Sequence, residues 1–357
     1  MNIKNGYEII NGRQLKKCNN NQERNAITRR CQKKVVNCKN IMIKYDGLNS
    51  CYLDSLLVSL FTNNDDSIYD TFFNSKIVNN KLSEKAENIR KELYNIYLII
   101  TGKNNTETHQ ICKTLRTLMN DYKVSYNLHY PNNTIDQNDW QRVQSEPVQT
   151  LEFFNIIFNY KDTTITTLRN WGTNNKKINL KLIRNTPHIT ERIEQSSFIY
   201  KIDCDISKNK INISDYIPSY IYTNEFGNND LWKPTGDDSN IKYKYKIEEI
   251  KINTALFLFV HINRIIYDIN KNSHIKSNTF VKIKNKLILG DNSKKNLHSI
   301  IIHNGGSKNG HYICIFKCKS KWYEFDDLKK KIKSIGTFTE LSKNKHYMTN
   351  CTDLIYI

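Results

Sequence analysis

The spacing of apolar residues predicts four helices in the first half of the chain. From Cys51 to Phe61 the apolar positions recur at every third or fourth residue, the spacing that buries one face of a helix. Similar patterns, with Gly102 after one segment and Pro147 in the first turn of another, predict three further helices. Their expected bounds are residues 83–101, 107–119 and 147–159.

The pattern changes after about residue 160. Runs of β-branched and aromatic residues, separated by clusters of Asn, Gly and Asp, predict strands. The expected strands are residues 255–262, 280–283, 286–289, 299–303, 312–317, 321–325 and 353–357. Helices followed by a sheet predict an α+β fold, with the functional residues where the two parts meet.

The first 40 residues show little apolar periodicity and are basic and polar. We expect a flexible arm or a loosely packed cap over residues 1–40, followed by one domain over residues 41–357. Cys18, Cys31 and Cys38 lie in this extension, but no fourth ligand stands at a zinc-like spacing. The extension therefore predicts no metal site.

Composition excludes several classes of protein. Charged residues at 25% and aromatic residues at 11% of 357 are typical of a globular chain. Apolar runs are far shorter than the roughly 20 residues that cross a bilayer, and Met1–Lys17 lacks the apolar stretch of a signal peptide, so no membrane partner is expected. Nine cysteines without a C-x-x-C pair favour a reducing, intracellular compartment, the cytoplasm first, with the nucleus or a virion as alternatives.

The net charge is strongly positive, with 54 Lys and Arg against 35 Asp and Glu and a formal charge of +19. Such a surface suits polyanions or an acidic partner. The abundance of Lys, Asn and Ile is also typical of coding bias in an AT-rich genome, such as that of a large DNA virus or a protist, and this bias raises Lys without any role in binding nucleic acid. We therefore do not expect nucleic acid as a partner.

One candidate for chemistry is a cysteine at the expected start of a helix. The segment from Tyr45 runs into the first predicted helix and places Cys51 in its first turn. Unpaired backbone N–H groups and the positive end of the helix dipole favour a thiolate there, and the thiolate is the nucleophilic form. The alternative is a small buried residue with no chemical role.

A second candidate is a glycine-rich loop that leads from His303 into a predicted β-hairpin. If the turn lies at Lys319–Ser320, antiparallel pairing brings His311 opposite Asp326 and Asp327, so an imidazole meets a carboxylate. The two aspartates point to opposite faces, and a change of one residue in register would exchange them. The pattern does not decide between them, and a surface histidine beside a solvated strand end remains the alternative.

Together these two segments resemble the Cys and His boxes of the ubiquitin-specific protease family. Residues 49–55, Asn-Ser-Cys-Tyr-Leu-Asp-Ser, are most similar to the cylindromatosis-type branch and differ from the commoner Asn-Thr-Cys-Tyr-Met-Asn-Ser. Residues 303–327 are similar to the His box, with its Gly-His-Tyr and Trp-Tyr-x-Phe-Asp-Asp elements. Segments 152–158, 256–265 and 353–357 resemble further family segments in the same order.

The resemblance implies a papain-like α+β cysteine protease with a helical thumb over about residues 41–160 and an antiparallel palm-and-fingers sheet over about residues 161–357. It implies hydrolysis of isopeptide or peptide bonds after the C-terminal glycine of ubiquitin, with ubiquitin or polyubiquitin conjugates as partners and with no cofactor or metal. Two alternatives remain open: a protease for another ubiquitin-like modifier or Gly-Gly precursor, and a weakly active module that binds ubiquitin or polyanions.

The resemblance also implies roles for individual residues. Cys51 would be the nucleophile, His311 the general base and acid, and Asp326 the carboxylate that orients the histidine. Asn49 would donate to the oxyanion together with the Cys51 backbone N–H, although a turn-forming or N-capping role fits it equally well. Asp327 would be a second support for this oxyanion hole.

Four residues are expected along the channel for the substrate tail. Gly305, Gly306 and Gly310 would let backbone approach backbone closely, and Glu152 would lie beside the tail. Gln149 stands where the family usually has an aspartate that would help hold a basic tail.

The zinc-binding fingers of many relatives cannot form in this chain. Cys204 is the only cysteine between residues 160 and 250, so the two C-x-x-C pairs that hold the zinc are missing. We expect fingers that are shortened or held by packing.

Overall fold

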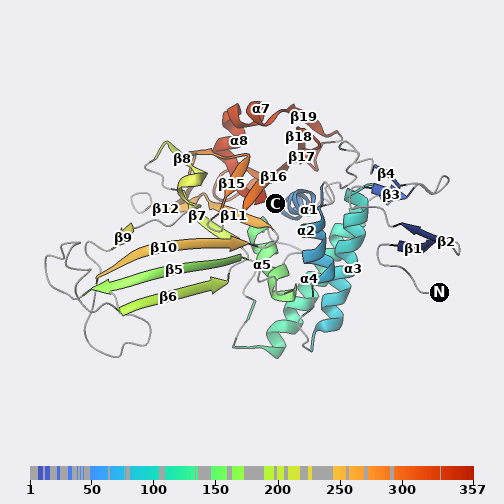
Figure 1. Ribbon diagram of the computed structural model, residues 1–357, viewed down its shortest axis with the longest axis horizontal. Helices are drawn as coiled ribbons and strands as arrows, with labels where there is room; N and C mark the ends of the chain where they lie inside the picture. The colour runs from blue at the N-terminus through green and yellow to red at the C-terminus, as the bar shows by residue number, and fades with distance from the viewer. Residues whose placement is uncertain are drawn as a thin grey trace. The chain divides into compact units, whose positions relative to one another are not determined.

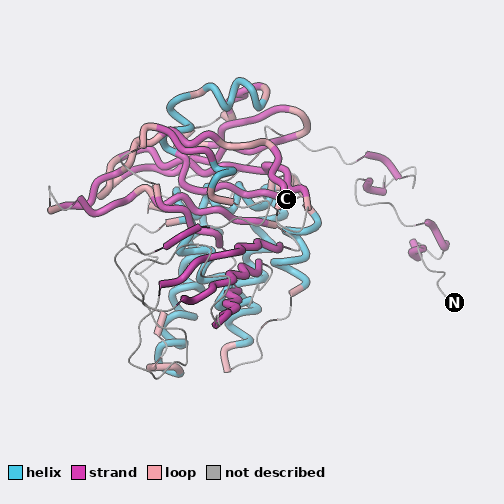
Figure 2. Tube along the Cα trace, turned by 60° about the vertical axis from the view of Figure 1, so that its left-hand side comes forward, coloured by secondary structure: helices cyan, strands magenta, loops and turns pink. Residues whose placement is uncertain are grey.

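The computed structural model describes much of the chain, and its secondary structure is shown in Figures 1 and 2. The described residues are 7–10, 13–16, 22–24, 31–33, 38, 41, 43, 49–62, 65–75, 77, 81–103, 109–132, 134–135, 146–158, 163–172, 189–196, 199–204, 208–217, 224–226, 244–254, 257–268, 272–289, 293–329 and 331–357. The chain forms two compact units, residues 1–38 and residues 39–357.

The first unit contains short paired strands. Strand β1 (Tyr7–Ile10) pairs antiparallel with β2 (Arg13–Lys16), and β3 (Gln22–Arg24) pairs antiparallel with β4 (Cys31–Lys33). These short strands were not predicted, and the expectation of a flexible arm or a loosely packed cap stays a prediction. Segments of three or four residues are too short to show the alternation by which a strand is recognised in a sequence.

The second unit begins with helices. They are α1 (Cys51–Phe61), α2 (Asp66–Tyr69) with a π-helical turn at Asp70–Asn74, α3 (Ser83–Ile100), α4 (His109–His129) and α5 (Pro147–Phe158). Of these, α1, α3, α4 and α5 were predicted from the apolar spacing. Helix α4 extends well beyond the predicted end at residue 119, and in this extension Tyr122 is buried and its ring stacks on that of Tyr126, four residues later.

Helix α1 is buried on every side. All eleven of its residues are buried, and it contacts α3 and α5 as well as strands of the main sheet. The Ser299 hydroxyl donates to the Ser59 carbonyl at 2.8 Å and so ties the helix to the sheet. Figure 1 shows α1 nearly end-on between the other helices and the sheet. A helix held in this way gives its first residue, Cys51, a fixed position.

The main sheet has the strand order β19-β18-β17-β16-β20-β11-β7, and β15 pairs with β16 outside this path. Pairing is antiparallel except between β11 and β7. The bounds are β7 (Ile199–Asp203), β11 (Leu258–Asn263), β15 (Lys286–Ile288), β16 (Lys294–Gly305), β17 (Gly310–Cys318), β18 (Lys321–Phe325), β19 (Lys333–Gly336) and β20 (Cys351–Tyr356). Six of these strands were predicted, with errors of a few residues at their ends.

The hairpin that carries His311 has the predicted turn. Cys318 pairs with Lys321 across Lys319 and Ser320, and Lys319 adopts the left-handed conformation with φ +57°. The preceding hairpin joins β16 to β17, and Gly305 pairs with Gly310 at its end. The chain therefore crosses the site in three consecutive antiparallel strands.

A second sheet has the strand order β6-β5-β10-β9 (Figure 1). Its strands are β5 (Thr163–Gly172), β6 (Ile189–Ser196), β9 (Asn224–Phe226) and β10 (Lys244–Thr254). Strand β10 pairs with β5 along its whole length, with one irregularity between Ile247 and Glu249. Long backbone ladders thus build this sheet in a region with a single cysteine, and its identity as the fingers stays a prediction.

Shorter elements complete the second unit. They are β8 (Lys210–Asn212) with β14 (Phe280–Lys282), β12 (Ile265–Asp268) with β13 (Ser273–Lys276), a 3-10 turn at Ile213–Asp215, α7 (Phe338–Lys343) and α8 (Lys345–Asn350). Within the part of the chain that is described, none of the helices combines the length and the apolar character that crossing a membrane requires.

Candidate active site

Cys51 is the first residue of α1. Ser50 holds the N-cap position, and its carbonyl accepts the backbone N–H groups of Leu53 and Asp54 at 2.8 and 2.9 Å. The Cys51 side chain is free and buried, with 5% of the residue exposed. Its thiol therefore lies in the first turn of a helix, where backbone N–H groups and the helix dipole favour negative charge.

Asn49 lies outside the helix, one residue before the N-cap. It is exposed and has a left-handed backbone with φ +58°, a conformation that asparagine tolerates better than most residues. The N-capping alternative for Asn49 is wrong, because Ser50 takes that position, and the turn-forming alternative stays a prediction. Its role at the oxyanion stays a prediction.

His311 and Asp326 meet across β17 and the end of β18. The imidazole Nε2 lies 2.8 Å from Asp326 Oδ1 and 3.3 Å from Asp327 Oδ1. Asp326 is held further by the Leu328 backbone N–H, which donates to Oδ1 at 3.1 Å, and by the Lys329 ammonium, 2.9 Å from Oδ2. The pattern could not choose between the two aspartates, whereas the geometry makes Asp326 the closer and better-held partner.

His311 and Asp326 each stabilise the charged form of the other. Burial alone would lower the pKa of His311, but hydrogen bonds with Asp326 and Cys51 and the charge of Asp327 outweigh it and raise the pKa to about 10. Burial would raise the pKa of Asp326, but hydrogen bonds from His311 and Lys329 lower it to about 2. Near neutral pH the pair is therefore an imidazolium beside a carboxylate.

Cys51 completes the arrangement, because its thiol is one of the groups that act on His311 and raise the pKa of the imidazole. Both carboxylates approach Nε2, so Nδ1 is the ring nitrogen that remains for the sulfur. The structure thus brings together the three residues proposed as nucleophile, base and orienting acid. Such an arrangement supports attack by a thiolate and transfer of a proton through the imidazole.

Two of the loop glycines are required by the hairpin itself. Gly305 has φ +147°, and a Cβ there would lie 2.4 Å from the Asn309 carbonyl oxygen. A Cβ on Gly310 would lie 2.1 Å from His303 Nε2, whereas Gly306 has nothing nearer than 3.8 Å. The close approach occurs within the loop, and the predicted contact with a substrate tail stays a prediction.

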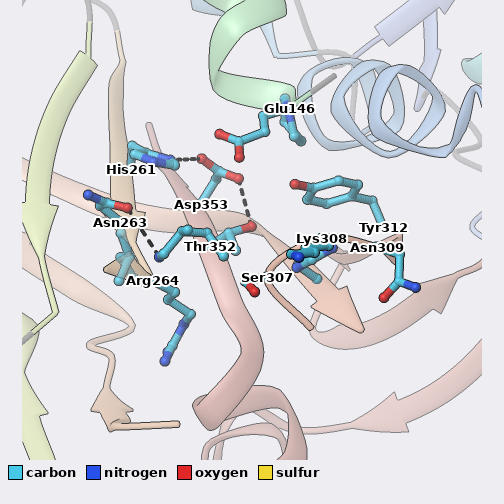
Figure 3. Close-up of a pocket in the computed structure, with 14 residues that line it drawn as sticks. Glu146, His261, Asn263, Arg264, Ser307, Lys308, Asn309, Tyr312, Thr352 and Asp353 are labelled. Carbon is cyan, nitrogen blue, oxygen red and sulfur yellow. Dashed lines mark hydrogen bonds and ion pairs between the residues drawn. The ribbon is translucent and has the colours of Figure 1, made fainter. Parts of the chain in front are cut away.

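A cavity of about 410 Å³ opens on the other side of this loop (Figure 3). Its lining includes Tyr312, loop residues 307–309, and three titratable side chains from separate elements: Glu146, His261 and Asp353. His261 and Asp353 are direct partners on β11 and β20, with Nδ1 2.7 Å from Oδ1. The Thr352 hydroxyl donates to the other Asp353 oxygen at 2.8 Å.

The titratable groups of this cavity influence one another. Burial would lower the pKa of His261, but the charge and hydrogen bond of Asp353 and the charge of Glu146 raise it. Burial raises the pKa of Glu146, an effect that the charge of His261 opposes. Arg264 also lines the cavity, but its guanidinium donates to the backbone carbonyls of Ser277, Thr279, Met348 and Cys351. Its donors are therefore occupied by the fold.

The sequence did not single out Glu146, His261 and Asp353 as site residues. A histidine in a buried strand and an aspartate in the closing strand were the available signals, but their pairing depends on the order of β11 and β20 in the sheet. Glu152, which was predicted beside the tail, is not among the residues that line the cavity. It lies 2.7 Å from Lys201 in an ion pair.

Among the described residues, one cluster of His, Cys, Asp or Glu side chains could hold a metal ion. It consists of His311, Asp326 and Asp327, whose ligand atoms lie within 4.8 Å of one another. The ion pairs between the imidazole and both carboxylates account for this proximity.

Comparison with known proteins places the chain in a family. The profile of the ubiquitin carboxyl-terminal hydrolase family matches residues 46–349. A chain of the SAGA DUB module of Ubp8, Sgf11, Sus1 and Sgf73 bound to monoubiquitin has the same fold, with a TM-score of 0.56 and 14% identity over 89% of this chain and 69% of that chain. The same module bound to ubiquitin aldehyde gives a TM-score of 0.56 and 15% identity over 90% and 71%. A comparison with curated protein sequences finds no match. The family match covers both boxes and most of the chain, which therefore belongs to the ubiquitin carboxyl-terminal hydrolase family.

Proposed function

We propose that this chain is a thiol-dependent deubiquitinase that hydrolyses the bond after the C-terminal glycine of ubiquitin. One observation carries the proposal: in a chain of this family, the His311 imidazole lies 2.8 Å from Asp326 and has its pKa raised by the thiol at the start of α1. We propose Cys51 as the nucleophile, His311 as base and acid, and Asp326 as the residue that orients His311.

The reaction would have two stages. The Cys51 sulfur attacks the carbonyl carbon of the terminal glycine, and the tetrahedral intermediate expels the amine as His311 gives it a proton. This leaves a thioester between Cys51 and ubiquitin. Water, deprotonated by His311, then attacks the thioester and releases the ubiquitin carboxylate and the free thiol.

Support for the oxyanion would come from the start of α1. The Cys51 backbone N–H and the Asn49 amide are the proposed donors, and the loss of one such donor typically costs about 10²–10³ in rate. Asp327 lies 3.3 Å from His311 Nε2, so we propose that it supports the site through the imidazole.

The cavity beside the glycine loop is the proposed place for the basic tail of ubiquitin. Gln149 accepts the Glu146 backbone N–H at 3.3 Å and carries no charge, while Glu146 and Asp353 bring carboxyl groups to the cavity wall. We propose that these two residues supply the negative charge that the family usually has at position 149. Gly305, Gly306 and Gly310 would border the tail on its way to Cys51.

A finer assignment concerns the branch of the family. The Asn-Ser-Cys-Tyr-Leu-Asp-Ser segment, with Asp54 in place of the commoner asparagine, supports a place near the cylindromatosis-type branch. The proposed partners are ubiquitin and its conjugates.

A ubiquitin carrying a C-terminal electrophile tests this proposal. We expect covalent labelling of the wild-type chain and none of Cys51→Ala, while Cys204→Ala, which removes another buried thiol, still labels. Labelling by the probe of a different modifier alone would replace the substrate with that modifier. Reversible binding of ubiquitin without labelling would contradict catalysis and support a binding module.

A further inference from the structure

Two buried carboxyl groups, those of Asp54 and Asp327, lie next to the proposed catalytic residues, with Asp327 beside His311. Asp54 on α1 is fully buried, and its Oδ2 accepts the Ser50 hydroxyl at 2.6 Å, whereas its buried Oδ1 has no hydrogen-bond donor. Asp327 is 7% exposed, and both of its carboxyl oxygens are buried without a donor in hydrogen-bonding geometry. Three buried carboxyl oxygens thus lack a hydrogen-bond donor if both groups are ionised, which is a costly arrangement even with the His311 imidazole 3.3 Å from one of them.

These oxygens belong to carboxyl groups that act on each other, because each group is among the causes of the other's pKa shift. Two carboxylates cannot form a hydrogen bond, because both only accept, whereas a carboxylic acid can donate to a carboxylate. Two like charges in a dry site also resist simultaneous ionisation. One proton between the groups removes both difficulties.

We propose that Asp54 and Asp327 share one proton that resides on Asp54, and that this hydrogen bond positions Asp327 as a carboxylate beside His311. Asp54 Oδ1 would donate to an Asp327 oxygen while Oδ2 keeps the bond from Ser50. Asp54 is then a positioning residue, because it acts on the proposed catalytic histidine through Asp327. Its effect on the rate rests on the proposed function, but the location of the proton does not.

The surroundings of the two groups favour this location. The groups that act on Asp54 are the Ser50 hydroxyl, the Cys112 thiol from α4, and Asp327. Asp327, after β18, faces the imidazolium of His311 at 3.3 Å as well as the charge of Asp326. A negative charge is therefore more stable on Asp327. In agreement, burial and the charge of Asp327 raise the pKa of Asp54, and burial also raises that of Asp327.

The sequence offers a matched substitution. The commoner Cys box of the family has an asparagine where this chain has Asp54, and an asparagine amide could donate to Asp327 in the same place. Asp54→Asn therefore keeps the donor and removes the titrating proton, whereas Asp54→Ala removes both. Asp121→Asn, which removes an exposed carboxylate on α4 that pairs with Lys85, is the control for the loss of a surface charge.

The first test is the pH dependence of unfolding by denaturant. A group whose pKa is raised by folding stabilises the protein at low pH and loses this contribution as the pH rises. Between pH 5 and 7 the unfolding constant of the wild type should therefore increase by up to about tenfold per pH unit relative to that of Asp54→Asn. Asp121→Asn should follow the wild type. Parallel curves for the wild type and Asp54→Asn would overturn the proposal.

The second test is infrared spectroscopy of protein labelled with ¹³C-aspartate at pH 7. We expect a carboxylic-acid band in the wild type that shifts with the label and is lost in Asp54→Asn. The absence of this band from the wild type, or its persistence in Asp54→Asn, would overturn the proposal. Neither result depends on ubiquitin hydrolysis, so failure of the proposed function would be seen separately.

Kinetics test the positioning role. With a ubiquitin C-terminal amide substrate, Asp54→Asn should keep kcat within about threefold of the wild type, whereas Asp54→Ala should lower kcat at least about tenfold with little change in KM. Equal losses in both variants, or no loss in Asp54→Ala, would contradict positioning through a donated hydrogen bond.

Discussion

Two histidine–aspartate pairs lie in or at the end of strands of the main sheet, one made through Nε2 of His311 and the other through Nδ1 of His261. His311 lies 2.8 Å from Asp326, and His261 lies 2.7 Å from Asp353. Each aspartate comes from a strand, or the end of a strand, that neighbours the strand of its histidine. In both pairs the carboxylate outweighs the effect of burial and raises the pKa of the histidine. The presence of an aspartate partner alone therefore does not distinguish the two histidines.

The neighbours of each pair make the difference. His311 has the Cys51 thiol as a partner on its other side, whereas His261 has Glu146 and a cavity of about 410 Å³. We therefore expect the first pair to move protons to and from the proposed nucleophile, and the second to present charge to a ligand in the cavity. The comparison shows that the helix start at Cys51, and not the histidine–aspartate pair alone, determines where chemistry can occur.

Removing each histidine in turn gives the largest expected contrast. His311→Ala should lower kcat/KM for ubiquitin hydrolysis by about 10⁴-fold or more, because the base and acid are lost. His261→Ala should act mainly through KM. Steady-state kinetics on both variants, after their folding has been checked by circular dichroism, test the contrast. Similar losses of kcat in the two variants would remove the distinction between the pairs.

Replacing the aspartates is expected to have a smaller effect. Asp326→Asn should lower kcat by about 10²–10⁴-fold, because His311 loses its orientation and its stabilising charge. The His311 pKa of about 10 implies that the imidazolium persists up to about pH 10 and is lost above it. In Asp326→Asn this alkaline limit should move to lower pH, as measured by pH profiles of kcat. An unchanged limit would argue that Asp326 does not set the charge of His311.

The cavity carboxyls should affect binding by a smaller factor. Glu146→Gln should raise KM for a ubiquitin substrate about tenfold and leave kcat nearly unchanged, because a charged hydrogen bond to a basic tail is typically worth about 1.5–3 kcal/mol. Glu87→Gln, a solvent-facing acidic position on α3, is the control. A change in kcat with constant KM would place Glu146 in the chemical step instead.

The smallest effect concerns stability. Because the pKa of His261 is raised in the folded protein, its contribution to the free energy of unfolding is complete below about pH 6.5 and is lost as the pH rises through the folded value. Urea denaturation of the wild type and His261→Gln should therefore differ more at pH 6 than at pH 9. His261 binds at most one proton, so the ratio of the two unfolding constants can change by at most about tenfold per pH unit. The opposite trend would mean that His261 is neutral in the folded protein.

Local sequence patterns predicted much of the fold. The periodicity of Cys51–Phe61 identified α1 with its bounds, and the hairpin of β17 and β18 has the turn expected at Lys319–Ser320. Strands β5, β6 and β10 were missed, because their alternation is irregular and their stability depends on pairing between distant segments.

The candidate site likewise contains residues that the sequence predicted and residues that it did not. Cys51, His311 and Asp326 lie in continuous motifs, and the sequence alone suggested all three. Asp54 and Glu146 were not suggested as site residues, because their significance depends on a partner that only the folded chain brings close, Asp327 for one and Asp353 with His261 for the other. A carboxyl group that stands alone in the sequence cannot reveal a shared proton.

The central claim is that Cys51 forms a covalent bond with the C-terminal glycine of ubiquitin. Mixing the chain with a ubiquitin substrate, quenching with acid and measuring the intact mass tests it most directly. We predict an adduct of one ubiquitin that is released by hydroxylamine and maps to the peptide containing Cys51, and a hydroxylamine-stable ester in Cys51→Ser. Turnover without an adduct, or an adduct on a different cysteine such as Cys351, would contradict the account.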